Sequence, residues 1–151
     1  MTVKSILMVC RGNICRSPMA EAYFRHQFKE SSITICSAGI SALVNYPADT
    51  KAQEVMMKLG IDLSNHRATQ LSNDLVRKAD LIFVMTKSQL HTVVRGYMTA
   101  KGKTFLLGHW HDFEILDPYT QPYEEFESAF EQIELAWQDW KSRILSCQTC
   151  V

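Results

Sequence analysis

Two thiols and two guanidinium groups lie close together in one short segment of the chain. The stretch VCRGNICRSP, residues 9–18, contains Cys10, Arg11, Cys15 and Arg16. A loop between a strand and a helix lines a concave nest with its backbone N–H groups, and a guanidinium fork binds two oxygens of a tetrahedral anion. The same positive field favours the thiolate form of a cysteine. We therefore predict that Cys10 is a nucleophile at the floor of an oxyanion site held by Arg16.

The residues between Cys10 and the second arginine suit a tight loop. Gly12 permits close backbone approach, and Asn13 tolerates a left-handed conformation. Ser17 and Pro18 predict the start of a helix, with the serine as N-cap and the proline at the first helical position. The Walker pattern is the competing phosphate loop, but its closing Gly-Lys-Ser/Thr is missing, so nucleotide binding is disfavoured. The predicted oxyanion loop consists of Cys10, Arg11, Gly12, Asn13, Ile14, Cys15, Arg16 and Ser17.

The composition is that of one globular domain, which we expect to span 1–151. Hydrophobic residues make up 46% of the 151 residues, and 16 basic residues balance 16 acidic ones. This balance gives no support for a nucleic-acid partner or an anionic membrane surface. The first apolar run is too short for an export signal, and none reaches the roughly 18 residues that span a bilayer. We expect a cytoplasmic protein without membrane insertion, whose five cysteines form no disulfide framework.

The elements that position the loop alternate between strands and helices. Strands are predicted at 4–9, 33–37, 81–85 and 104–108, and helices at 17–28, 48–59, 73–77, 88–97 and 123–145. This order indicates a three-layer α/β/α fold, with a four-stranded parallel sheet and helices on both faces, of the doubly wound, flavodoxin-like kind. One apolar stripe of the last helix should face the sheet: Phe126, Phe130, Ile133, Trp137, Trp140 and Ile144. Ligands of such sheets bind beyond the carboxyl ends of strands, where the loop lies.

Several motifs resemble those of one known family. The stretch VCRGNICRSPMAEA is similar to the signature loop of the low-molecular-weight protein tyrosine phosphatases. The resemblance continues in the same order through SAG (37–39), LGIDLSNHRATQL (59–71), ADLIFVMT (79–86) and DPY (117–119). GHW (108–110) and the lack of aromatic residues near position 43 resemble the bacterial subgroup linked to exopolysaccharide export. The resemblance implies an enzyme that hydrolyses phosphotyrosine without a metal or other cofactor.

The resemblance also assigns catalytic roles. Cys10 attacks phosphorus and forms a cysteinyl-phosphate, while Arg16 and the loop amides hold the equatorial oxygens. Asp117 protonates the leaving phenolate and then activates water, which agrees with the need of a phenolate for a proton donor. The alternative for Asp117 is an ordinary turn with Pro118, because Asp-Pro is common in turns. Cys15 matches a cysteine that forms a disulfide with the nucleophile under oxidation in the family. This disulfide protects the nucleophile from irreversible overoxidation.

Other residues are assigned to supporting positions by the same resemblance. The loop is held by Asn13, Ser17, Ser37 and His66. Substrate entry is framed by Arg11, Ile40, Leu43 and Tyr119. Leu43 and Thr120 stand where animal members carry aromatic residues, and Thr69 and Thr86 also depart from residues typical of the family. Arg11 replaces a usually apolar residue, which favours acidic peptides.

Two other functions compete with phosphotyrosine hydrolysis. An arsenate reductase uses the same loop but needs a relay of further cysteines, and residues 81–146 contain none. A catalytically inactive phosphotyrosine-binding module would lack Cys10, Arg16 or Asp117, and all three residues are present. The expected partner is a phosphotyrosine protein, namely a cognate tyrosine kinase of exopolysaccharide production.

Two smaller motifs have too few donors for a zinc site. Cys147-x-x-Cys150 is interpreted as a frayed chain end, and His109-x-His111 as an incidental pair.

Overall fold

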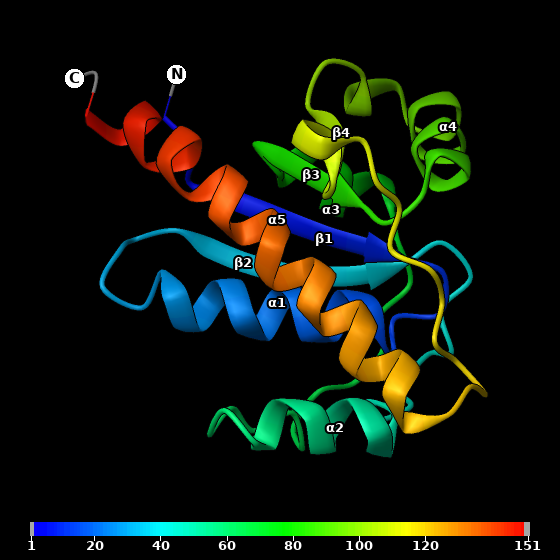
Figure 1. Cartoon of the computed structure of the whole chain (residues 1–151). Helices are drawn as coiled ribbons and strands as arrows, with labels where there is room; N and C mark the ends of the chain where they lie inside the picture. The colour runs from blue at the N-terminus through cyan, green and yellow to red at the C-terminus, as the bar shows by residue number, and fades with distance from the viewer. Residues whose placement is uncertain (1, 150–151) are drawn as a thin grey trace.

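A computed structural model of the chain describes the backbone of residues 2–149 and the side chains of residues 2–146. It contains a four-stranded sheet in the order β2-β1-β3-β4, with every pair parallel. The strands are β1 (Ser5–Cys10), β2 (Thr34–Gly39), β3 (Leu81–Val84) and β4 (Thr104–Leu106). The predicted parallel sheet is therefore confirmed (Figure 1).

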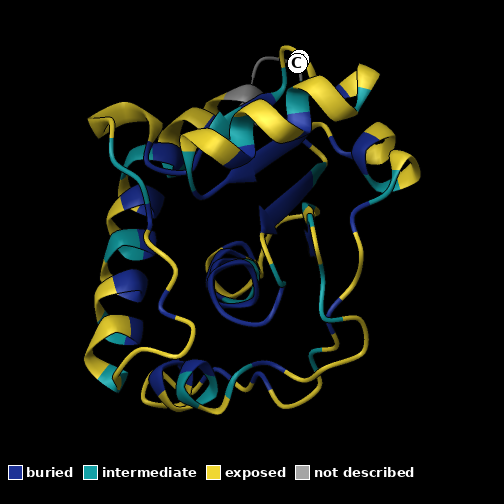
Figure 2. Ribbon diagram, turned by 90° about the vertical axis from the view of Figure 1, so that its right-hand side faces the viewer, coloured by how far each residue is buried: buried dark blue, intermediate teal, exposed yellow. Residues whose placement is uncertain are grey.

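Helices cover both faces of this sheet (Figure 1). One face carries α1 (Arg16–Gln27), α2 (Thr50–Met57) and α5 (Tyr123–Thr149). The other carries α3 (Asn73–Lys78) and α4 (Lys87–Gly96). Two short 3-10 turns that the sequence did not predict are η1 (Met98–Ala100) and η2 (His109–His111). Figure 2 shows buried strands between helices whose outer surfaces are exposed, which confirms the three-layer arrangement.

The apolar run of β1 is explained by its place at the centre of the sheet. Ile6, Met8 and Cys10 contribute to the core beneath α1 and α5. Leu7 and Val9 point the other way, into the core beneath α3 and α4. A strand covered on both faces needs apolar side chains at every position, so it shows no alternation with polar residues.

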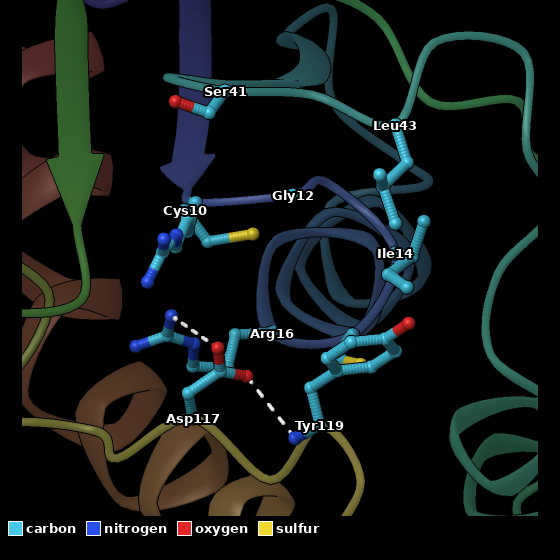
Figure 3. A pocket seen from close by; sticks show the side chains of 10 residues that line it. Cys10, Gly12, Ile14, Arg16, Ser41, Leu43, Asp117 and Tyr119 are labelled. Carbon is cyan, nitrogen blue, oxygen red and sulfur yellow. Dashed lines mark hydrogen bonds and ion pairs between the residues drawn. The ribbon is translucent and has the colours of Figure 1, made fainter.

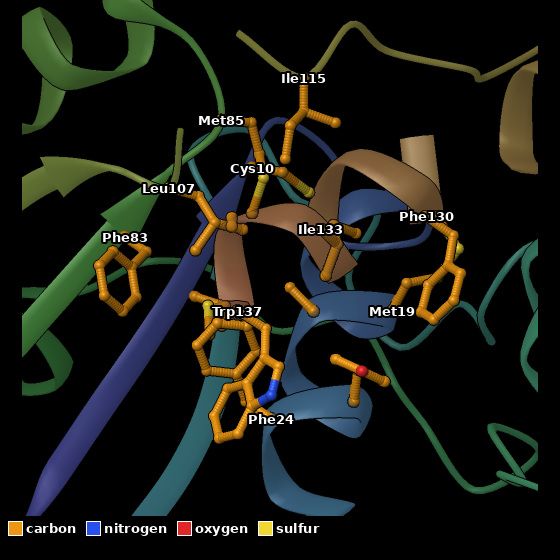
Figure 4. Packing of buried hydrophobic residues seen from close by; sticks show 14 of the residues in the cluster. Cys10, Met19, Phe24, Phe83, Met85, Leu107, Ile115, Phe130, Ile133 and Trp137 are labelled. Atoms are coloured by element: carbon orange, nitrogen blue, oxygen red, sulfur yellow. The ribbon is translucent and has the colours of Figure 1, made fainter. Parts of the chain in front are cut away.

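The apolar stripe of α5 packs against the sheet as predicted. All six of its residues are at most 6% exposed. Figure 4 shows Ile133 and Trp137 among Phe24, Phe83 and Met19. Trp140, from the same stripe, donates its Nε1–H to the carbonyl oxygen of Leu107 at 2.8 Å. The stripe therefore packs α5 against α1 and against the sheet at β3.

The end of the chain differs from the prediction. The helix continues to Thr149 instead of ending near residue 145, so the backbone at Cys147 is helical and does not form a tail. The side chain of Cys147 and the whole of Cys150 lie outside the described residues.

The start of α1 also corrects the sequence prediction. Cys15 is the N-cap residue and makes no side-chain capping bond, so Ser17 is already the second residue of the helix and Pro18 the third. The hydroxyl of Ser17 does not cap the helix because it is bonded to the Cys10 sulfur. Proline is tolerated at the third position since N–H groups of the first turn have no acceptor within the helix.

The packing of α5 predicts unequal effects for two residues of the same helix. Ile133 is fully buried, whereas Leu135 is 55% exposed. Ile133→Ala should lower the free energy of unfolding by about 2–5 kcal/mol, because a cavity replaces its contacts with the core. Leu135→Ala should change it by less than about 1 kcal/mol. Urea denaturation followed by fluorescence measures both, and equal losses would contradict the assigned stripe.

Candidate active site

The loop of residues 10–16 lies at the carboxyl end of β1 and leads directly into α1. Cys10 is the last residue of β1 and Arg16 the first of α1. Both side chains are buried, at 2% and 3% exposure. Figure 3 shows the Cys10 sulfur pointing into a cavity between the loop and the segment that carries Asp117 and Tyr119. The fold thus brings the predicted nucleophile, arginine and acid to one place.

The carbonyl groups of the loop are directed away from its centre. Three of them accept bonds of 2.9, 2.9 and 3.1 Å from the following backbone pairs: Ile40 N–H to Cys10, Ser41 N–H to Arg11 and Leu43 N–H to Gly12. Because C=O and N–H of one trans peptide unit point in opposite directions, the next N–H groups turn inward. The segment after β2 therefore shapes the loop into a nest of donors, which suits an anion.

The sulfur of Cys10 is surrounded by donors. It accepts the N–H of Asn13 at 3.3 Å and lies 2.8 Å from the hydroxyl oxygen of Ser17. That oxygen already accepts the Asn13 Nδ2–H at 2.7 Å, so its own hydrogen is free to point at the sulfur. The N-terminal end of α1 adds the positive end of its dipole. These contacts stabilise negative charge on the sulfur.

Asn13 is the centre of the network that holds the loop. Its φ of +60° is the left-handed conformation that the sequence predicted. Its Nδ2 also donates to Ser37 Oγ at 2.9 Å, and its Oδ1 accepts the N–H of Thr69 at 2.8 Å. Its carbonyl oxygen lies 2.7 Å from His66 Nε2. The structure therefore joins Asn13, Ser17, Ser37 and His66, the four predicted supporting residues, in one network.

One member of this network was missed from the sequence. Ser37 Oγ donates to Glu21 Oε1 at 2.5 Å, which links β2 to α1. Glu21 lies four residues after Ser17 and hence on the same face of the helix, a spacing that could have indicated it. The departure at Thr69 has no effect on the contact with Asn13, because the backbone N–H makes it.

Arg16 divides its donors between the protein and the cavity. Its Nη1 donates to the carbonyl oxygen of Ile115 at 2.8 Å, and its Nη2 lies 3.5 Å from Asp117 Oδ2. Its buried Nε has no hydrogen-bond partner among the described residues. A buried guanidinium N–H without an acceptor is costly, so it favours a ligand that supplies one.

Asp117 forms a turn with Tyr119 and also faces Arg16. Its side chain is 42% exposed, and its Oδ2 faces Arg16. Its Oδ1 accepts the N–H of Tyr119 at 3.1 Å, as in an Asx turn. Figure 3 shows both contacts as dashed lines. The turn therefore orients a carboxyl group beside the cavity.

The cavity has a volume of about 420 Å³ and combines a charged floor with apolar walls. Cys10 and Arg16 form the floor, and Ile14, Leu43 and Tyr119 lie together on one side of it (Figure 3). Such a cavity suits a ligand whose anionic group binds at the floor and whose aromatic ring contacts the apolar walls.

The structure places three of the four predicted entry residues at the cavity. Arg11, Leu43 and Tyr119 line the cavity, and so do Ser41 and Ile14, which were not predicted as walls. Ile40 does not line this cavity; it lines a neighbouring one and packs against the core beneath α3 and α4. Side chains alternate along an extended chain, so the direction that buries Ala38 also carries Ile40 to that face.

Cys15 lines the same cavity but differs from Cys10 in its surroundings. Burial raises the pKa of the Cys15 thiol, and the nearby Asp49 and Cys10 raise it further. The raised pKa therefore favours the protonated thiol of Cys15, and both Cys10 and Cys15 are free of disulfide bonds.

Comparison with known proteins identifies the family. A family model described as "Low molecular weight phosphotyrosine protein phosphatase" matches residues 5–148. The chain belongs to this family. The phosphatase is 44% identical over 144 residues to the low molecular weight protein-tyrosine-phosphatase Ptp of Acinetobacter johnsonii, covering 95% of this chain and 100% of the relative.

Solved structures agree with this family. The phosphatase superposes with a TM-score of 0.89 and 41% identity on the tyrosine phosphatase Wzb from Escherichia coli K30 in complex with sulphate, covering 95% and 99% of the two chains. The phosphatase also superposes on the YwlE arginine phosphatase from Geobacillus stearothermophilus, with a TM-score of 0.89 and 30% identity, over 96% of this chain and 95% of the other. The predicted family resemblance and fold are confirmed.

Two further features of the phosphatase concern metals and membranes. Among the described residues, no group of three or more His, Cys, Asp or Glu could hold a metal ion. His111 instead lies 2.7 Å from Asp139 through its Nδ1. Within the same part of the chain, no helix has the length and apolar character to span a bilayer.

The Asn13 network predicts a large effect on stability. Asn13→Ala removes three side-chain hydrogen bonds, two of them buried and one partly buried, and should lower the free energy of unfolding by about 2–4 kcal/mol. Asn45 is the matched control, since it also has a positive φ, of 69°, but is exposed. Asn45→Ala should cost only the backbone strain, about 1 kcal/mol. Urea denaturation compares the two, and similar losses would show that the network adds nothing.

Proposed function

We propose that this enzyme hydrolyses phosphotyrosine with Cys10 as nucleophile, Arg16 as the anion-binding group and Asp117 as the general acid. One observation carries the proposal: the Cys10 sulfur and the unpartnered buried Nε of Arg16 lie at the floor of the same cavity, among the described residues. Asp117 Oδ2 lies 3.5 Å from the guanidinium of Arg16, at the edge of that cavity. A nucleophile, an anion clamp and a carboxyl group are the parts that phosphoryl transfer to a thiolate needs.

The first step transfers the phosphoryl group to the sulfur. The loop amides and Arg16 hold the three equatorial oxygens and stabilise the charge that spreads over them in the transition state. The Cys10 thiolate attacks phosphorus in line, the S–P bond forms, and the bond to the phenolic oxygen breaks. Asp117 gives its proton to that oxygen, so tyrosine leaves as a neutral phenol.

The second step releases phosphate. A water molecule enters where the phenol has left. The water oxygen attacks phosphorus while the Asp117 carboxylate accepts one of the water protons. The S–P bond breaks, and its electron pair returns to Cys10 as the thiolate. Ser17 stabilises that thiolate through its hydroxyl, 2.8 Å from the sulfur. The cycle ends with the starting protonation states.

The walls of the cavity support phosphotyrosine over phosphoarginine. Ile14, Leu43 and Tyr119 line the path to the sulfur and offer apolar contact to a phenyl ring. A guanidinium group in the same position would need several hydrogen-bond acceptors, which the Ile14 and Leu43 side chains do not have. Despite the structural similarity to an arginine phosphatase, these apolar walls support tyrosine as the proposed phosphorylated side chain.

The partner and setting follow from the family resemblance. We propose that the substrate is a tyrosine kinase of exopolysaccharide production, on the basis of GHW (108–110) and the aliphatic Leu43. We place the reaction in the cytoplasm, because a thiolate nucleophile needs reducing conditions. Cys15, which lines the cavity beside Cys10, is the proposed redox partner that protects the nucleophile.

The nucleophile is tested by replacing its sulfur. Cys10→Ser should lower turnover of phosphotyrosine peptides at least about a thousandfold, because a serine hydroxyl is a far weaker nucleophile in this loop. Binding of phosphate should persist, since the loop amides and arginine remain. Cys36→Ser is the matched control, a half-buried free thiol of β2, and should retain activity. Phosphate release and calorimetric titration measure the two properties, and one tenth of the original activity in Cys10→Ser would exclude this nucleophile.

The acid is tested with two leaving groups. Asp117→Asn should slow phosphotyrosine hydrolysis by about a hundredfold or more, because the phenol of tyrosine has a pKa near 10 and needs the proton. The loss on p-nitrophenyl phosphate should be much smaller, since its leaving group departs without one. The ratio of kcat/KM for the two substrates is the measurement. Equal losses would mean that Asp117 only shapes the turn.

A further inference from the structure

A second cavity lies beside the catalytic one and shares part of its wall. It has a volume of about 370 Å³. Arg11, Arg16, Ser41 and Asp117 line both cavities. Its outer wall is the beginning of α4, with Thr86, Ser88, Gln89 and Thr92. A side chain bound there would therefore be a neighbour of a phosphotyrosine in the first cavity.

Gln89 presents an unused amide donor at this second cavity. The residue is only 9% exposed, and its Oε1 accepts the N–H of Met85 at 2.9 Å. A backbone N–H must meet an acceptor, so this bond fixes the orientation of the amide and turns the NH₂ group away from Met85. Within the described residues, Nε2 donates no hydrogen bond. Because the amide is held in this orientation in the cavity wall, its Nε2 is available to donate to a ligand that carries an acceptor.

The charge of the second cavity is set by Arg11. Arg16 and Asp117 face each other at 3.5 Å and largely offset one another. Arg11 is exposed, and its guanidinium forms no ion pair or hydrogen bond within the described part of the chain. The N-terminal end of the ten-residue α4 lies on the same side, but its first N–H, that of Lys87, is bonded to Glu114 Oε2 at 2.7 Å, so the positive charge at the cavity comes from Arg11. The cavity thus combines an unpaired cation with an oriented amide donor.

We propose that the second cavity binds the carboxylate of an acidic residue that flanks phosphotyrosine in the substrate. Arg11 supplies a charged fork for the carboxylate, and Gln89 Nε2 donates to one of its oxygens. Ser41 and Ser88 add hydroxyl groups to the wall. The inference rests on the proposed phosphotyrosine activity and adds a substrate class to it, namely peptides with glutamate or aspartate beside the phosphotyrosine.

The test compares matched phosphotyrosine peptides. Glutamate or glutamine is placed at each of the two positions on either side of phosphotyrosine, one position at a time. At one or more positions, kcat/KM should be about three- to tenfold higher for glutamate, the effect of one exposed ion pair with a charged hydrogen bond. The ratio should fall toward one in about 1 M salt, because exposed charges are screened.

Two variants locate the preference in this cavity. Gln89→Glu keeps an acceptor for the Met85 N–H but replaces the donor with a negative charge, so the glutamate-to-glutamine ratio should fall to one or below. Arg11→Gln should also lower this ratio. Any effect of the substitution on catalysis itself is common to both peptides and therefore cancels in the ratio. Arg95→Gln is the matched control: it removes one exposed positive charge from the far end of α4 and should leave the ratio unchanged.

The outcomes separate this inference from the activity on which it rests. Equal rates for glutamate and glutamine at all positions in the unmodified enzyme would overturn the inference, whether or not Gln89→Glu folds. A preference that survives both variants would also overturn it, since another surface would then bind the carboxylate. Failure to hydrolyse any phosphotyrosine peptide would instead contradict the proposed function.

Discussion

The active-site loop depends on one buried amide in a left-handed conformation. The Asn13 side chain donates to one residue of α1 and one of β2, and accepts from the segment after His66. Each partner belongs to a different part of the fold, so the loop keeps its shape only when the sheet and α1 are already packed. The direction of the loop amides and the position of the Cys10 sulfur both follow from this arrangement.

The order of the strands explains why the other half of the site comes from distant sequence. The chain passes from β1 to β2 on one side and later to β3 on the other, which leaves a crevice at the carboxyl end of β1. The segment of Ile115 and Asp117 crosses this crevice, held by the Ile115 N–H to Met85 at 2.9 Å and by Arg16. Arg16 therefore holds the segment of Ile115 and Asp117 with the same guanidinium group that we propose binds the anion.

The sequence predicted those features that depend on periodicity and on short motifs. The stripe of α5 and the four strands follow from apolar spacing, and the left-handed Asn13 from its residue type. The N-cap prediction for Ser17 failed because a local capping rule cannot foresee that a cysteine takes the hydroxyl. The direction of Ile40 depends on how far β2 continues, and the bond of Glu21 to Ser37 on packing between helix and strand. Such contacts are tertiary and leave only a faint local signal.

The bond between Asn13 and Thr69 has an evolutionary consequence. The donor is a backbone N–H, so nineteen of the twenty amino acids can supply it, and only proline cannot. The residue type at position 69 can therefore change without affecting the loop that its backbone N–H supports. Ser37 lacks this freedom, since its hydroxyl accepts from Asn13 and donates to Glu21 at once. Substitutions should therefore accumulate unevenly around the loop, at a rate set by whether backbone or side chain holds it.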